Sequence, residues 1–149
     1  MGTNNMKKYL VIFICLFLYG CASVSAHISI NRNFDKDTTF LIPKSNDPIG
    51  VAKVISKEIS RRGYSVQVLE ESMLEIKNTT QSKDILIDYS YTSTYDAFHY
   101  TLTKFDMKLL DRNNYEVIAA VNFSGASPKS YAGIVQGALK QLFNKAKIK

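Results

Sequence analysis

The 149-residue chain is poor in the residues from which catalytic and metal sites are built. It has two cysteines, two histidines and no tryptophan, and its seven glycines nowhere form a phosphate-binding loop. No cysteine cluster and no histidine pair at ligand spacing occurs, which argues against a zinc or other transition-metal site. Ser124-Gly125 lacks the surrounding Gly-x-Ser-x-Gly pattern of a hydrolase nucleophile. We therefore expect no catalytic residue, no metal and no cofactor, and hence no enzyme.

The N-terminal segment has the pattern of a secretory signal peptide. Met6-Lys7-Lys8 is a basic start, and residues 9–18 form an uncharged apolar run. A membrane span needs roughly 20 apolar residues, so this run is too short for one. Two alternatives stay open. Cleavage after Val24-Ser25-Ala26 would release a soluble periplasmic protein that begins at His27, and the segment could also remain as an uncleaved anchor.

The leader ends in Leu18-Tyr19-Gly20-Cys21, which resembles the lipobox of bacterial lipoproteins, with Tyr19 where that motif has a smaller residue. The resemblance implies cleavage before Cys21 and acylation of this cysteine, so that acyl chains anchor the protein to the membrane. Ala22 follows where an aspartate would favour the inner membrane, which implies the periplasmic leaflet of the outer membrane. The expected organisation is a signal peptide (1–20), a lipidated tether (21–26) and one periplasmic α+β domain (27–149).

Loss of the leader changes both the thiol content and the charge of the chain. Cys15 would be discarded and Cys21 acylated, so the domain has no thiol left for a disulfide. Without Lys7 and Lys8 the formal net charge falls from +6 to +4. The remaining bases are spread over helix ends and faces, which is typical of solvated surfaces, with weak attraction to anionic lipid or to peptidoglycan carboxylates as the alternative. We expect no nucleic-acid partner, because no aromatic-basic readout motif is present.

Hydrophobic periodicity predicts two helices and a mostly antiparallel sheet. Alternating or β-rich runs predict strands, and Asn46-Asp47-Pro48 predicts the start of a helix that Gly63 ends. Gly125-Ala126-Ser127-Pro128 predicts the start of a second helix. The strands are expected at 27–31, 38–42, 64–69, 84–91, 99–110 and 116–124. The order β-β-α-β-β-β-β-α indicates a two-layer α+β sandwich of about five or six strands with both helices on one face.

Several pieces of the chain resemble small bacterial outer-membrane lipoproteins with a common domain of unknown function. They are the double strand around Asp35-Lys36-Asp37, the helix end Ser60-Arg61-Arg62-Gly63-Tyr64, the strand at 83–89, and Met107-Lys-Leu-Leu-Asp-Arg112. The family's hairpin often has a tryptophan after its turn, where this chain has Val117 or Ile118. The resemblance implies a periplasm-facing protein.

Aromatic residues are concentrated in one part of the chain, around a loop at 93–97. They are Tyr89, Tyr91, Tyr95, Phe98, His99 and Tyr100. Tyrosine suits positions with one apolar and one wet end, so Tyr91, Tyr95, Phe98, His99 and Tyr100 are candidates for a hairpin that docks on a partner or on lipid. The alternative is cross-strand packing of Tyr89 and Tyr91 on the core face.

Two functions follow as hypotheses. The first is a non-enzymatic outer-membrane lipoprotein that serves as an accessory or adaptor and binds an envelope protein through a sheet edge or the tyrosine-rich hairpin. The second is a carrier that binds a small ligand or lipid between the sheet and the helices. A buried apolar cavity would favour the carrier, and a solid core with an exposed aromatic patch would favour the adaptor.

Overall fold

A computed structural model describes residues 22–30, 34–43, 45–70, 84–95 and 97–146. These residues form eight elements in the order β-β-α-β-β-β-β-α, as the periodicity predicts. The elements are β1 (Ser23–Ile28), β2 (Thr39–Ile42), α2 (Val51–Ser60), β3 (Ser65–Val68), β4 (Ile85–Tyr95), β5 (Tyr100–Asp111), β6 (Val117–Ser124) and α4 (Tyr131–Lys145).

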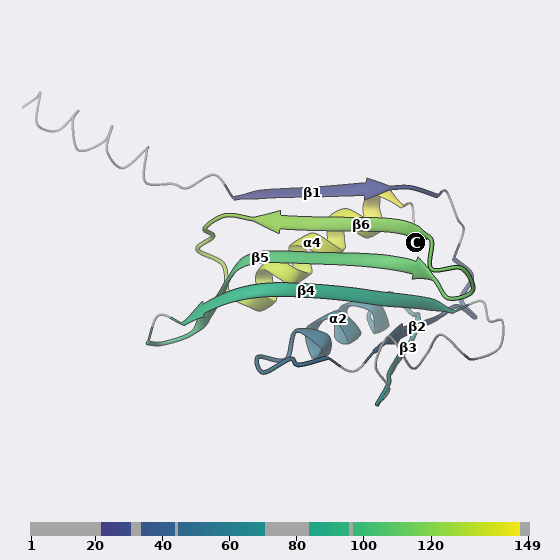
Figure 1. The fold of residues 1–149 in the computed structure, drawn as a ribbon, viewed down its shortest axis with the longest axis horizontal. Helices are drawn as coiled ribbons and strands as arrows, with labels where there is room; N and C mark the ends of the chain where they lie inside the picture. Colours follow the sequence, from purple (N-terminus) through teal and green to yellow (C-terminus); the bar gives the residue numbers. More distant parts are fainter. Residues whose placement is uncertain (1–21, 31–33, 44, 71–83, 96, 147–149) are drawn as a thin grey trace, which may run out of the picture.

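One six-stranded sheet carries both helices on the same face, which confirms the predicted α+β sandwich (Figure 1). The strand order is β1-β6-β5-β4-β2-β3. The pairs β1–β6, β6–β5 and β5–β4 are antiparallel, whereas β2 pairs parallel with both β3 and β4. The sheet is therefore mixed, with the two edge strands β1 and β3 drawn from the first half of the chain.

The main core lies between the sheet and the two helices. Alternate residues of each strand point toward the helices, so Phe105 of β5 and Phe40 of β2 are fully buried there with Phe143 of α4. The α2 helix adds Val51, Ile55 and Ile59. A smaller cluster of Leu41, Leu86 and Leu110 lies on the opposite face, near the β2 side of the sheet.

The first strand begins earlier than the sequence pattern predicts. β1 starts at Ser23 and ends at Ile28, whereas the expected strand covered 27–31 and the residues before it were assigned to the tether. The reason is that Val24 and Ala26 alternate with serines and pack toward the core, where Ala26 is buried. The Lys145 ammonium also donates to the Ala26 carbonyl at 2.6 Å. The segment expected to be a tether is thus mostly part of the sheet.

The start of α2 is also later than predicted, although the predicted cap is present. The helix begins at Val51, and Gly50 before it has the left-handed φ of 78° that glycine adopts at low cost. The Asp47 carboxylate accepts hydrogen bonds from the backbone N–H of Val51 at 2.9 Å and of Ala52 at 2.7 Å. These bonds satisfy two of the donors that a helix N-terminus leaves unpaired.

Candidate functional site

The β4–β5 hairpin ends in exposed aromatic side chains, which we call the aromatic tip: Tyr95, Phe98, His99 and Tyr100. Phe98 is 89% exposed, Tyr95 61% and Tyr100 43%, and these are large apolar groups that folded domains usually cover. In Figure 1 the hairpin projects past the ends of the neighbouring strands at the left of the sheet. The structure therefore brings four of the five candidate partner-binding residues together at one exposed turn.

Local contacts give the aromatic tip a defined shape. The rings of Tyr95 and Tyr100 face each other across the hairpin with centroids 5.0 Å apart. The Tyr95 hydroxyl donates to the Ala97 carbonyl at 3.2 Å, and Ala97 has a left-handed φ of 73°. Such a φ is uncommon outside glycine, so the turn is held by its surroundings.

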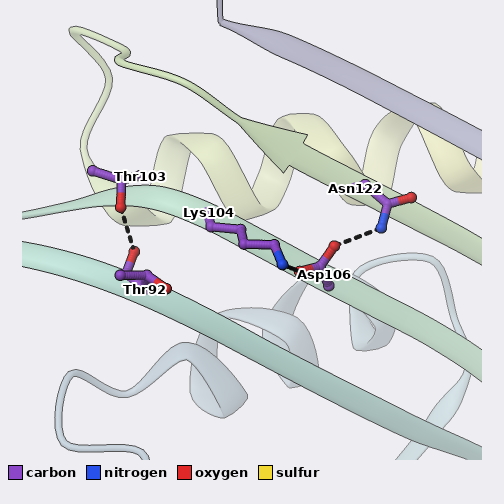
Figure 2. Close-up of polar contacts among 5 residues, drawn as sticks. All are labelled: Thr92, Thr103, Lys104, Asp106 and Asn122. Carbon is purple, nitrogen blue, oxygen red and sulfur yellow. Dashed lines mark hydrogen bonds and ion pairs between the residues drawn. The ribbon is translucent and has the colours of Figure 1, made fainter.

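A β-bulge lies at the base of the projecting hairpin. Thr92 pairs with Lys104 but Ser93 pairs with Leu102, which leaves Thr103 without an opposing residue. Its hydroxyl donates to the Thr92 carbonyl at 3.3 Å, as Figure 2 shows. Bulges bend a strand and increase its twist, so this one sets the direction in which the aromatic tip leaves the sheet.

Tyr91, the fifth candidate, lies apart from the aromatic tip and points toward the helices. Its hydroxyl donates to Asp47 Oδ1 at 2.9 Å, and the Tyr89 hydroxyl donates to Asp47 Oδ2 at 3.3 Å. The two rings are stacked, with centroids 6.5 Å apart. Together with the two helix N–H groups, these hydroxyls give the Asp47 carboxylate four hydrogen bonds. Tyr89 and Tyr91 thus pack against the core, as the alternative interpretation predicts, and they tie β4 to the start of α2.

The surroundings of these two tyrosines favour their neutral forms. Burial raises the pKa of Tyr89 to about 12, although its hydrogen bond with Ser45 acts in the opposite direction. Burial also raises the pKa of Tyr91 to about 12, and its hydrogen bond to the Asp47 carboxylate adds to the effect. A hydroxyl that donates to a carboxylate must keep its proton. Both groups are therefore structural donors at neutral pH.

The sheet face opposite the helices is polar and hollowed. A depression of about 330 Å³ lies over β4, β5 and β6, and is lined by Asp88, Tyr89, Ser90, Lys104, Asp106, Lys108 and Asn122. Asp106 accepts from the Asn122 amide at 2.5 Å and lies 3.2 Å from the Lys104 ammonium (Figure 2). Lys104, Asp106 and Asn122 therefore pair with one another on a face whose polar side chains are typical of a solvated sheet face.

Neither a metal site nor a membrane-crossing helix is found in the described ranges. No group of three or more His, Cys, Asp or Glu residues is arranged there to hold a metal ion. No helix there is long and apolar enough to cross a bilayer. The expected signal peptide and the lipidation candidate Cys21 lie outside the described residues.

Sequence patterns identify the aromatic tip but miss the partner of Tyr89 and Tyr91. Asp47 is recognisable as a helix cap from Asn46-Asp47-Pro48, yet nothing in that pattern indicates tyrosines more than forty residues away. The signal that was available is the alternation of the β4 run, which puts both tyrosines on the face that also carries Ile85 and Ile87.

Comparisons with known proteins show a fold relationship only. No family model and no curated protein matches the chain. The solved structures similar to this chain include the PelC dodecamer from Paraburkholderia phytofirmans and a point variant of it. Each has a TM-score of 0.53 and 10% sequence identity, and each match covers 87% of this chain. The matches cover 100% of the variant chain and 99% of the other. The chain therefore shares its fold with PelC over most of its length.

Proposed function

We propose that this chain is a lipid-anchored accessory protein of the bacterial outer membrane, facing the periplasm, without catalytic activity. Its aromatic tip docks on a further envelope component. The observation that carries the proposal is the exposure of Phe98, Tyr95 and Tyr100 together at the free end of a hairpin. Exposed aromatic clusters on a folded domain mark contact sites, and isolated exposed apolar residues do not.

The extent of β1 supports an anchor at Cys21 over release at His27. The strand begins at Ser23, and all six of its residues pair with β6. Cleavage before Cys21 leaves this strand whole. Cleavage after Ala26 would remove four of its residues, including the buried Ala26, and would uncover the edge of β6.

The packing between sheet and helices favours the adaptor over the carrier. The layer that a carried ligand would occupy is filled by fully buried side chains, among them Phe40, Phe105 and Phe143. Among the described residues, hollows lie outside this layer: the depression on the outer sheet face and one of about 250 Å³ beside Pro43 and Tyr89. Ligand pockets are lined mostly by apolar side chains, whereas the depression on the outer sheet face is lined mostly by polar and charged ones.

Association between copies of this chain is a second element of the proposal. PelC, which shares the fold, forms dodecamers. In the part of the chain that the structure describes, the edge strands β1 and β3 each have a neighbouring strand on one side only, and Val68 on β3 is a 55% exposed hydrophobic. Such edges can pair with another chain. Light scattering on the purified acylated protein should give a multiple of the protomer mass. A monomer at all concentrations would refute self-association.

Two experiments test the proposal. Radiolabelled palmitate should enter the wild type and should not enter Cys21→Ser, and equal labelling of both would refute the anchor. A photoreactive residue at Tyr95 should cross-link to an envelope component in intact cells. The matched control is the same residue at Glu116, an exposed position between β5 and β6, at the end of β5 opposite to the aromatic tip. Cross-linking no stronger from Tyr95 than from Glu116 would refute docking by the aromatic tip.

A further inference from the structure

The aromatic tip and the start of β1 lie at the same end of the sheet. Ser23 pairs with Ser124, Ser124 with Lys104, and Lys104 with Thr92, so these four residues form one row across the sheet. From this row β1 runs away from the aromatic tip, and β4 runs on toward it (Figure 1). The chain therefore enters the domain at the end from which the aromatic tip projects.

Chain length limits how far the anchor can lie from the start of β1. Cys21 precedes Ser23 by two residues, so an extended chain carries it at most about 7 Å beyond the row. Tyr95 follows Thr92 by three residues of strand, which corresponds to about 10 Å, and Phe98 lies farther along the turn. β1 and β4 are three strand spacings apart, or about 14 Å. An acylated Cys21 at a bilayer surface therefore leaves the aromatic tip within reach of that surface.

The composition of this end suits a bilayer surface. Tyrosine rings place an apolar body and a polar hydroxyl at the boundary between lipid and water, and phenylalanine adds apolar area. Between Ser93 and Thr103 and in the adjoining loop 125–130, the sequence has one acidic residue, Asp96, and one basic residue, Lys129, which is exposed. Its charge is attractive to anionic headgroups. Asp96 in the turn lies outside the described residues.

The exposed tyrosine and phenylalanine rings of the aromatic tip do not by themselves supply the area of a protein interface. A specific protein–protein contact buries about 800 Å² on each partner. Tyr95, Phe98 and Tyr100 bury about 150–250 Å² each when they are fully covered, so these three side chains alone supply less than that area. Contact with the lipid surface does not need a minimum area for stable binding, because the covalent acyl chains already hold the protein at the membrane.

We propose that the aromatic tip inserts into the headgroup region of the bilayer that holds the acyl chains of Cys21. This inference rests on the proposed function and names the envelope component that the aromatic tip contacts. Two membrane contacts, at β1 and at the β4–β5 turn, stand the sheet upright on the membrane. The polar sheet face and the β3 edge are then turned sideways, where other envelope components can reach them.

The absence of tryptophan from the sequence allows a direct test. Phe98→Trp places the protein's sole indole on the aromatic tip, and Glu116→Trp places it at the opposite end of the sheet. The full acylated proteins are reconstituted into vesicles of phosphatidylethanolamine and phosphatidylglycerol, with or without acyl chains brominated near the headgroup. In brominated vesicles the Phe98→Trp fluorescence should lose intensity, and its emission should lie at shorter wavelength than in detergent-free buffer without lipid. The Glu116→Trp emission should not change.

Equal emission from the two variants in vesicles, without quenching of either, would overturn the lipid contact. If photo-crosslinking from Tyr95 then captures a protein in cells, the proposed function stands with a protein at the aromatic tip. Quenching of both variants would also overturn the upright arrangement, because the whole domain would then lie on the membrane. Failure of palmitate labelling is a separate result that removes the anchor itself.

Discussion

The four hydrogen bonds to Asp47 make Asp47→Ala the substitution with the most clearly defined effect. The change removes the cap of α2, which costs about 0.5–2 kcal/mol. It also removes the acceptor of the Tyr89 and Tyr91 hydroxyls. Hydrogen bonds to a charged group contribute about 1.5–3 kcal/mol each. The two tyrosine hydrogen bonds should each contribute less than this range, because the Tyr89 bond is 3.3 Å long and both rings are partly exposed. The expected loss of unfolding free energy is about 3 kcal/mol.

Urea unfolding followed by circular dichroism measures this loss, and Asp37→Ala is the matched control. Asp37 is an exposed aspartate in the loop before β2, and its replacement should change the free energy of unfolding by less than about 0.5 kcal/mol. A double-mutant cycle between Asp47→Ala and Tyr91→Phe should give a coupling energy of about 1 kcal/mol, since the two groups contact each other. A loss below about 1 kcal/mol for Asp47→Ala, or no coupling with Tyr91, would refute this account of the cluster.

Three further predictions concern pH, the core and the first strand. Because the pKa of Tyr89 and of Tyr91 is raised to about 12 in the folded protein, the unfolded chain ionises first above pH 10. Their contribution to stability is therefore complete below pH 10 and is lost as pH rises toward 12. In urea unfolding, the variant with both Tyr89→Phe and Tyr91→Phe should lose less free energy of unfolding over this pH range than the wild type. An equal loss would refute the role given to the two hydroxyls. Phe143→Ala should reduce the free energy of unfolding by about 4 kcal/mol, because Phe143 is fully buried against both layers, and a loss under about 1.5 kcal/mol would contradict the described core. Deletion of residues 22–26 should cost about 3 kcal/mol or more through the lost β1–β6 hydrogen bonds, and an unchanged thermal midpoint would show that β1 is dispensable.

The secondary structure was predictable where the hydrophobic pattern of a segment determines whether that segment forms a strand or a helix. The alternation in residues 99–110 and 116–124, with a polar turn between them, predicts the β5–β6 hairpin that the structure contains. The parallel pairing of β2 with β3 and β4 was not predictable in this way. Periodicity shows which face of a strand is buried and gives no information on which strand lies beside it.

The start of β1 illustrates how one pattern can support two structures. Ser23-Val24-Ser25-Ala26 consists of small residues, which suits a cleavage site or a tether as well as a strand. What decides in favour of the strand is pairing with the edge of β6 and packing against α4, which together bury Ala26. Both features exist only after the rest of the chain has folded.

The candidate site likewise contains residues whose surroundings the sequence predicts and one residue, Tyr91, whose surroundings depend on tertiary packing. The cluster of aromatic residues in the sequence identifies the aromatic tip, because a turn leaves its side chains exposed whatever lies elsewhere. Tyr91 belongs to the same cluster in the sequence but to a different environment in the fold. Its assignment depends on Asp47, which approaches it through packing of α2 against the sheet.

The central claim is that an envelope component covers the aromatic tip in cells. Thiol labelling tests it most directly, because the domain has no cysteine of its own after Cys21. Single cysteines introduced as Phe98→Cys and Glu116→Cys should both be exposed in the isolated domain, where a membrane-impermeant maleimide should label them at similar rates. In spheroplasts that retain the acylated protein, the account predicts rapid labelling of Glu116→Cys and strong protection of Phe98→Cys. Equal labelling of the two positions in spheroplasts would contradict it.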